Sequence, residues 1–231
     1  MSSAIDSLGE ELIRTVQAVV ASGAISMSKH GNVSLRVPGR DELLFTAGGS
    51  LAAFDRKGIV RLALDGTLLE GELPPLAAAV VDMHAVIYQE RPDTGCVIHT
   101  HSPFATAFAV AGRPIECWTE AFGIFGLEDG VPLADYGPRG SKESTDNIRS
   151  ALGARTRAVL LANHGVLTFH RTAAETVTLG VVIEEAAQSA VYASGIGGAE
   201  AIPPEMLRAS HDRAAAFQAT GTVGTRRASP S

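Results

Sequence analysis

The segment Cys96-Val97-Ile98-His99-Thr100-His101-Ser102-Pro103 determines most of what the sequence predicts about the fold. Its apolar first half predicts a buried strand over 96–100, and Pro103 begins an expected helix over 103–111. Residues two apart in an extended chain point to the same face, so the imidazoles of His99 and His101 can converge on one point. A His-x-His pair alone is weak evidence for a metal site, because packed or exposed histidines produce the same pattern.

A third histidine ends a second apolar strand. His164 follows Leu160-Leu161-Ala162-Asn163, where we expect a strand over 158–161 that pairs with another over 165–169. Three neutral imidazoles suit a divalent ion of borderline softness and leave positions open for a substrate oxygen. The spacing leaves two possibilities open, convergence of the three histidines or separate packing.

The remaining segments alternate between helices and short strands. Expected helices cover 6–21, 76–90, 142–152, 173–192 and 203–219, and expected strands cover 32–37, 42–46, 59–63 and 67–69. Residues 116–140, rich in Gly and Pro, are expected to form a loop with short strands. We find no internal repeat and no linker. This pattern predicts one α/β domain over residues 1–219 and a flexible tail over 220–231.

The composition limits the classes of function. The chain has 231 residues, of which 45% are hydrophobic and 19% are charged, and this excludes disorder as the main state. A net charge of −6 argues against a partner that is a nucleic acid or an anionic membrane. The sequence has no membrane-span pattern, no signal pattern, and only two cysteines. We therefore expect a soluble, cytoplasmic protein.

Three segments, in this order, resemble the class II aldolase/adducin family. They are His30-Gly31-Asn32-Val33-Ser34-Leu35-Arg36, Val97-Ile98-His99-Thr100-His101-Ser102-Pro103 and Leu161-Ala162-Asn163-His164-Gly165-Val166. The resemblance, over about residues 8–200, implies a three-layer α/β/α fold with a mainly antiparallel central sheet. It also implies a homotetramer with active sites at subunit interfaces. By the same resemblance, His99, His101 and His164 hold one divalent metal ion per subunit, and Zn, Mn, Co and Fe(II) are all compatible.

The sequence departs from the family where its sugar-phosphate enzymes carry acid/base and phosphate-binding groups. Val80 stands where those enzymes have a carboxylate, and Ala78 and Ala79 replace two serines just before it. Lys29 and Gly48 stand at the positions of two phosphate-binding threonines. These differences predict a substrate that carries no phosphate.

The loss of the carboxylate also limits the reaction. An aldolase needs a base that removes a proton from carbon, and Val80 cannot act as one. Asp82, two residues along the helix, is expected to face away from the site and to be a poor substitute. Decarboxylation needs no such base, because a metal can stabilise the electrons that remain when CO2 leaves. The favoured function is therefore a carbon–carbon lyase that decarboxylates a hydroxy-aromatic (dihydroxyphthalate-like) or related unsaturated carboxylate.

Three alternatives remain. The first is a class II aldolase or epimerase that acts on a sugar phosphate with another acid/base. The second is a non-heme iron oxygenase on the same scaffold, since three imidazoles with open positions also hold Fe(II). The third is a non-enzymatic module of the adducin type, which the retention of all three histidines disfavours.

Residues 29–32, in the first glycine loop, and Gly48, in the second, have expected roles near the substrate. Lys29 and His30 are predicted to be catalytic, holding the substrate carboxylate or donating a proton to carbon; the alternative is a pair of solvated loop cations. Gly31, Asn32 and Gly48 are predicted to bind the substrate, Gly31 and Asn32 through backbone and amide donors. A purely structural turn is the alternative for Gly31 and Asn32.

Three further residues have weaker assignments. Glu120 aligns with a tyrosine that the family's aldolases supply across the interface, and it is predicted to be an acid/base unless it is a surface residue. Arg139 has a fork that suits a substrate carboxylate, with loop solvation as the alternative. His84 resembles a family residue near the metal and is predicted to support the metal ligands from behind. The alternative for His84 is an ordinary core histidine.

Overall fold

Within residues 3–220, eight strands form one sheet in the order β4-β3-β2-β1-β5-β8-β7-β6, and this sheet carries every predicted metal ligand at one of its ends or turns. The computed structural model describes residues 3–220. The strands are β1 Gly31–Arg36, β2 Glu42–Thr46, β3 Ile59–Ala63, β4 Leu68–Glu70, β5 Cys96–Thr100, β6 Leu133–Ala134, β7 Ala158–Leu161 and β8 Gly165–His170. All neighbours pair antiparallel except β6 and β7, which are parallel. The prediction of a mainly antiparallel sheet is confirmed.

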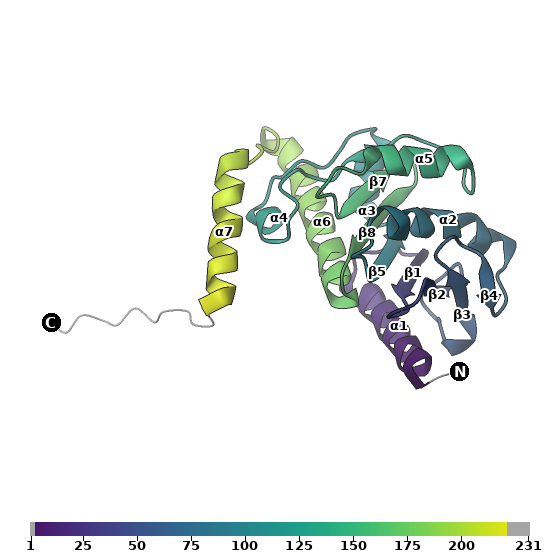
Figure 1. The fold of residues 1–231 in the computed structure, drawn as a ribbon. Helices are drawn as coiled ribbons and strands as arrows, with labels where there is room; N and C mark the ends of the chain where they lie inside the picture. Colours follow the sequence, from purple (N-terminus) through teal and green to yellow (C-terminus); the bar gives the residue numbers. More distant parts are fainter. Residues whose placement is uncertain (1–2, 221–231) are drawn as a thin grey trace.

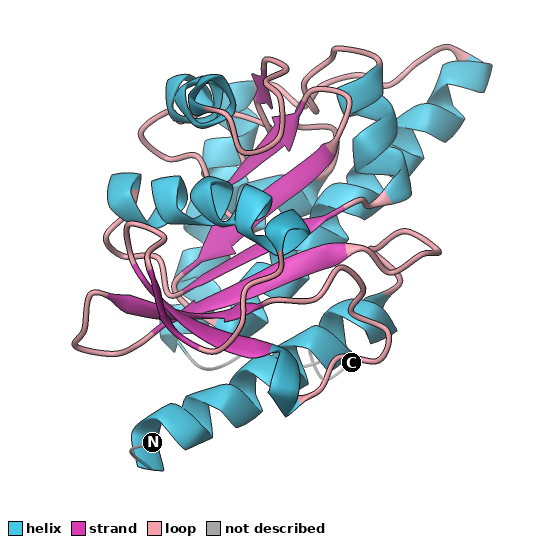
Figure 2. Cartoon of the chain, turned by 90° about the vertical axis from the view of Figure 1, so that its right-hand side faces the viewer, coloured by secondary structure: helices cyan, strands magenta, loops and turns pink. Residues whose placement is uncertain are grey.

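Helices cover both faces of this sheet (Figures 1 and 2). They are α1 Ser3–Ser22, α2 Pro75–Glu90, α3 Pro103–Val110, α4 Glu120–Ile124, α5 Lys142–Ala151, α6 Ala173–Ala193 and α7 Pro204–Thr220, with short 3-10 turns at Arg56–Gly58 and Ser194–Ile196. One core cluster joins α2 and α5 to one face of the sheet, and two others join α1, α3 and α6 to the opposite face. The predicted three-layer α/β/α arrangement is therefore confirmed.

The central strand β5 explains why its sequence is apolar throughout. All five of its residues are buried, because helices cover it on both sides. Val97 packs in the cluster with α2, while Cys96 and Ile98 pack in the cluster with α1. Since side chains alternate along a strand, His99 shares the α2 face with Val97.

The structure differs from the sequence predictions mainly in the C-terminal half. The expected loop 116–140 also contains α4, a helix of five residues whose Phe122 is fully buried. α4 lies between α6 and α7 in Figure 1, so distant helices and not local periodicity stabilise it. Thr220, expected to begin the tail, is the last residue of α7. The rest of the expected tail lies outside the described residues.

None of the helices within residues 3–220 combines the length and the apolar run that a membrane crossing requires.

Candidate metal centre

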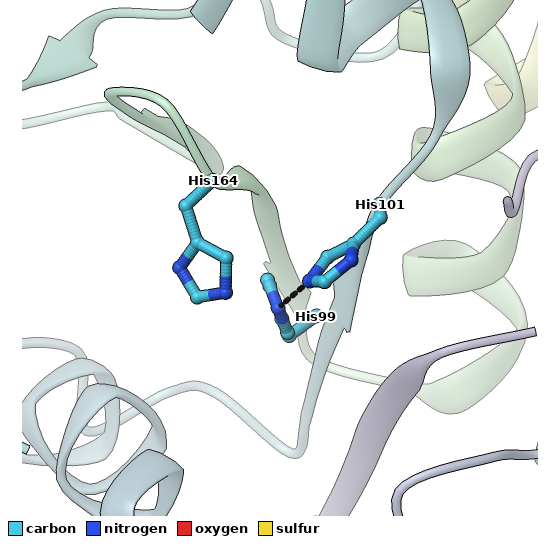
Figure 3. Close-up of side chains that lie close together, drawn as sticks. All are labelled: His99, His101 and His164. Atoms are coloured by element: carbon cyan, nitrogen blue, oxygen red, sulfur yellow. Dashed lines mark hydrogen bonds between the residues drawn. The ribbon is translucent and has the colours of Figure 1, made fainter. Parts of the chain in front are cut away.

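Three histidines, from the end of β5 and from the neighbouring β7–β8 hairpin, meet at one point (Figure 3). His99 lies near the end of β5, His101 follows that strand directly, and His164 lies in the turn between β7 and β8. β5 pairs with β8, which places this turn beside the end of β5. The sequence left open whether the three histidines converge or pack separately. In the structure they converge.

The turn is shaped for this approach. Asn163 has a φ of +57°, a left-handed conformation that asparagine tolerates better than most residues. Gly165 has no room for a side chain, because a Cβ there would stand 2.5 Å from the Thr100 carbonyl oxygen and 3.1 Å from ring atoms of His99 and His101. The glycine of the Asn-His-Gly segment is therefore required by close packing against β5.

The three imidazoles fit a divalent ion. The Nε2 atoms of His99 and His101 lie 3.1 Å apart, and one nitrogen from each histidine lies within 4.8 Å of the others. Ligand nitrogens about 2.1 Å from a tetrahedral ion lie about 3.4 Å from one another. The Nε2 atom of His164 is buried and has no hydrogen-bond partner among the described residues. A metal ion would satisfy this atom.

The surroundings keep these imidazoles neutral, which is the form that binds a metal. Burial, with added repulsion from the neighbouring histidines, holds the pKa of His99 well below its usual range. Burial, followed by repulsion from His101 and Arg139, lowers the pKa of His164 to about 4. Burial and then Arg139 also lower the pKa of His101. His99 Nδ1 lies 3.1 Å from the carbonyl oxygen of Val166, which leaves its Nε2 directed to the cluster.

A cavity of about 360 Å³ opens beside two of the histidines, and we call it the Val80 cavity. Its lining includes His30, Gly31, Asn32, Gly48, Val80, His99, His101 and Arg139. Ala47, Leu76 and Ala77 add apolar surface. Among the described residues, no carboxylate lines this cavity. Val80 lines the same cavity as His99 and His101 with an apolar side chain.

A second cavity, of about 210 Å³, lies against His164 and also includes Arg139. We call it the Asp82 cavity, because Asp82 lines it together with Ala79 and Met83 of α2. Asp82 does not line the Val80 cavity, in agreement with the expectation that it faces away, but it contributes to the lining of this second cavity. Its Oδ1 lies toward the β3–β4 turn, 3.4 Å from the position that a Cβ on Gly66 would take.

Sequence reasoning missed the polar lining of the Asp82 cavity. Asp135, Ser144 and Asn163 line it, and the first two come from the loop before α5 and from the first turn of that helix. The sequence did contain one signal for this cavity. Ala79, Asp82 and Met83 lie three and four positions apart, so they share one face of a helix.

The glycine-loop residues are only partly brought to the site. His30 lines the Val80 cavity; its Nδ1 lies 2.8 Å from Ser28 Oγ, and its ring stacks 6.4 Å from that of His101. Gly31 is required by strand pairing, because a Cβ there would stand 2.6 Å from the His99 carbonyl oxygen. Asn32 Nδ2 donates to the Gly48 carbonyl at 3.4 Å. Lys29 has a φ of +55° and lines neither cavity, so its role stays a prediction.

The other predicted residues fall in three different places. Arg139 is exposed and lines both cavities. His84 is fully buried; its Nδ1 lies 2.8 Å from Ser34 Oγ, and no hydrogen bond joins it to the three histidines. Glu120 begins α4, lines neither cavity and accepts a hydrogen bond from Ser210 Oγ at 2.8 Å. Within one chain, Glu120 does not line either cavity. Its contribution to the active site of a neighbouring subunit therefore stays a prediction.

Known proteins resemble this chain in sequence and in fold. A family model described as the Class II Aldolase and Adducin N-terminal domain matches residues 10–191. A 5-methylthioribulose-1-phosphate/5-deoxyribulose-1-phosphate aldolase from Rhodospirillum rubrum is 32% identical over 197 residues, covering 85% of this chain and 86% of that protein. A 5-deoxy-D-ribulose 1-phosphate aldolase from Bacillus thuringiensis is 30% identical, covering 86% and 91%. The solved structure of an L-fuculose 1-phosphate aldolase aligns with a TM-score of 0.80 at 26% identity, covering 92% and 96%.

Proposed function

The chain belongs to the class II aldolase and adducin family, and on this basis we propose that it is a divalent-metal-dependent carbon–carbon lyase. We further propose that it decarboxylates a non-phosphorylated hydroxy-aromatic or related unsaturated carboxylate. The observation that carries the second step is Val80, which lines the same cavity as His99 and His101 with an alkyl side chain. The family resemblance predicts a carboxylate at this position in sugar-phosphate enzymes. A reaction that begins with removal of a proton from carbon finds no carboxylate base among the described residues of this cavity.

The lining of the Val80 cavity suits a flat, anionic substrate. Leu76, Ala77 and Val80 supply an apolar wall that a ring can contact. Arg139 offers a planar fork that can hold a carboxylate by two hydrogen bonds. A divalent ion held by His99, His101 and His164 supplies a Lewis acid that stabilises negative charge on substrate oxygens.

The chain must also provide a proton. When the bond between the ring carbon and the carboxyl group breaks, CO2 leaves and the electron pair stays on the ring carbon. That carbon then gains a hydrogen, so the reaction consumes one proton. His30 is our proposed donor, because it lines the same cavity and stacks on His101.

A second function, aldol cleavage of a sugar phosphate, is favoured by the relatives named above, which are sugar-phosphate aldolases. Three carboxylates are available for it: Asp82 and Asp135, which line the second cavity, and Glu120 from a neighbouring subunit. The Val80 cavity suits a sugar phosphate less well, because no carboxylate or hydroxyl side chain lines it among the described residues.

One panel of reactions separates these functions. Protein loaded in turn with Zn, Mn, Co and Fe(II) is incubated with dihydroxylated benzene dicarboxylates and, separately, with five- and six-carbon ketose 1-phosphates. We expect CO2 from the first group at unchanged oxygen concentration, and none from a His101→Ala variant. Cleavage of the ketose phosphates alone would favour the aldolase, and turnover that requires oxygen would favour the iron oxygenase.

We also propose a homotetramer with active sites at subunit interfaces. The support is the family membership and the position of Glu120, which lies on α4 outside both cavities of its own chain. The mass in solution, measured by light scattering, tests this assembly.

A further inference from the structure

Glu184 is a buried carboxylate that neither proposed reaction uses. It lies in α6 with 8% of its surface exposed, and burial raises its pKa. Its Oε1 accepts a hydrogen bond from the backbone N–H of Phe104 at 2.9 Å, and its Oε2 accepts one from Ala105 at 2.8 Å. A buried carboxylate is costly unless its oxygens are satisfied. Here both oxygens are committed to the start of α3.

The first turn of α3 depends on this carboxylate. Pro103, its first residue, has no N–H, and Ser102 at the N-cap makes no side-chain capping bond. The Ser102 hydroxyl donates instead to the Ala24 carbonyl at 2.7 Å. The N–H groups at the start of a helix have no partner within the helix. Those of Phe104 and Ala105 therefore take theirs from α6, and the negative charge also suits the helix dipole.

Only one residue, Ser102, separates His101 of the metal centre from the first residue of α3. β5 ends at Thr100 and α3 begins at Pro103, so His101 and Ser102 form the whole connection. Ser102 is fixed from both sides, because its Oγ also lies 2.7 Å from Thr100 Oγ1. A change in the direction of α3 would therefore move His101, whose Nε2 must stay close to that of His99. Functional side chains tolerate a displacement of only about 0.5 Å.

We propose that Glu184 is a positioning residue for the metal centre: by fixing the first turn of α3, it holds His101 where its imidazole meets those of His99 and His164. This inference rests on the proposed metal-dependent function. It adds a residue from a distant helix, on the opposite face of the sheet from α2, to the parts that determine metal affinity.

The test is the affinity for Co2+ in the Glu184→Gln variant, read from the visible absorption of the bound ion. The amide keeps the size of the side chain but loses the charge, and its NH2 group would face an N–H donor. We expect Co2+ binding to weaken about 10-fold, with a changed absorption spectrum, as partners of metal ligands show on mutation. Glu175→Gln is the matched control, since Glu175 lies on the same helix and accepts the Thr172 N–H in a capping box. It has no bond to α3 and should leave Co2+ affinity unchanged.

The outcomes separate this inference from the proposed function. A wild-type protein that fails to bind Co2+ overturns the metal site itself. A wild-type protein that binds Co2+, with Glu184→Gln showing the same affinity and spectrum, overturns only the role of Glu184. If Glu184→Gln does not fold, Glu184→Asp is measured in its place, because it keeps the charge on a side chain one methylene too short to reach both N–H groups. Unchanged affinity in that variant also overturns the inference.

Discussion

At the scale of the residue, the account depends on the alkyl side chain at position 80. Val80 and Asp82 lie on opposite sides of α2 and face different cavities, and only Val80 shares a cavity with His99 and His101. If the substrate is a carboxylate held in the Val80 cavity, a new negative charge there should repel it. The same change would instead restore an acid/base group to an aldolase.

We therefore predict that Val80→Glu lowers kcat/KM for decarboxylation at least about 10-fold relative to Val80→Gln, equivalent to about 1.4 kcal/mol. Val80→Gln is the control because it has the same length without the charge. Steady-state CO2 release measures both variants. Equal loss in the two variants, or a gain of ketose-phosphate cleavage in Val80→Glu, contradicts this account of the cavity.

His84 provides a second prediction at this scale. Burial lowers its pKa to about 3, so the folded protein excludes a proton that the unfolded chain binds below about pH 6.5. Its contribution to stability is complete above that pH and is lost as the pH falls toward the folded value. In metal-free protein, the free energy of unfolding should fall between about pH 6 and 4 more steeply than in His84→Gln, by up to about 1.4 kcal/mol per pH unit. Urea unfolding at several pH values measures this; parallel curves would contradict it.

At the scale of the element, the β7–β8 turn and the end of β5 form the metal centre together. Gly165→Ala should push these elements apart, because its Cβ would stand 2.5 Å from a backbone oxygen. We expect a loss of about 2 kcal/mol or more in unfolding free energy, together with weaker Co2+ binding. Gly180→Ala in α6 is the control: its Cβ would meet its nearest neighbour at 3.9 Å, and alanine favours a helix by about 0.5–1 kcal/mol. Equal behaviour of the two variants would refute the close-packing argument.

The elements also show what the sequence can predict. Strand β5 and helix α2 each have a local pattern of apolar residues, and the sequence predicted both elements from it. The five-residue α4 has no such pattern, because its Phe122 is buried against elements distant in the sequence. The bond between Glu184 and the start of α3 joins residues 80 positions apart. Nothing in the local sequence distinguishes this glutamate from an exposed helical one.

The same difference applies within the site. His99, His101 and His164 are recognisable because they follow apolar strands in family-like segments. The Asp82 cavity was missed, since it needs the packing of the loop before α5 over α2: Gly140 lies close enough that a Cβ on it would contact Ala79 at 3.4 Å. Helical periodicity placed Asp82 on the opposite side from Val80, but it did not show what lies there.

At the scale of the whole molecule, a chain of net charge −6 must gather positive charge where it binds an anion. Arg139, at the junction of the two cavities, and a divalent ion would supply that charge within one chain. The predicted tetramer would add Glu120 from a neighbour, so a complete site would need two chains.

Mixed assemblies test this arrangement. If Glu120 is an acid/base supplied across the interface, neither Glu120→Gln nor His101→Ala alone should be active. Co-refolded mixtures of the two should then regain activity at about one site in four, where the intact His101 and Glu120 of different chains meet in a cyclic tetramer. Activity of Glu120→Gln alone would show that this residue is not an acid/base. An inactive mixture would place both residues in the same chain's site.

The most direct test of the central claim is a titration of metal-free protein with a divalent ion, followed by CO2 release from a dihydroxylated benzene dicarboxylate. The account predicts no release without metal and a linear rise in rate that stops at one ion per chain. Release that is independent of metal, or a fully loaded protein that releases no CO2 but cleaves a ketose phosphate, would contradict it.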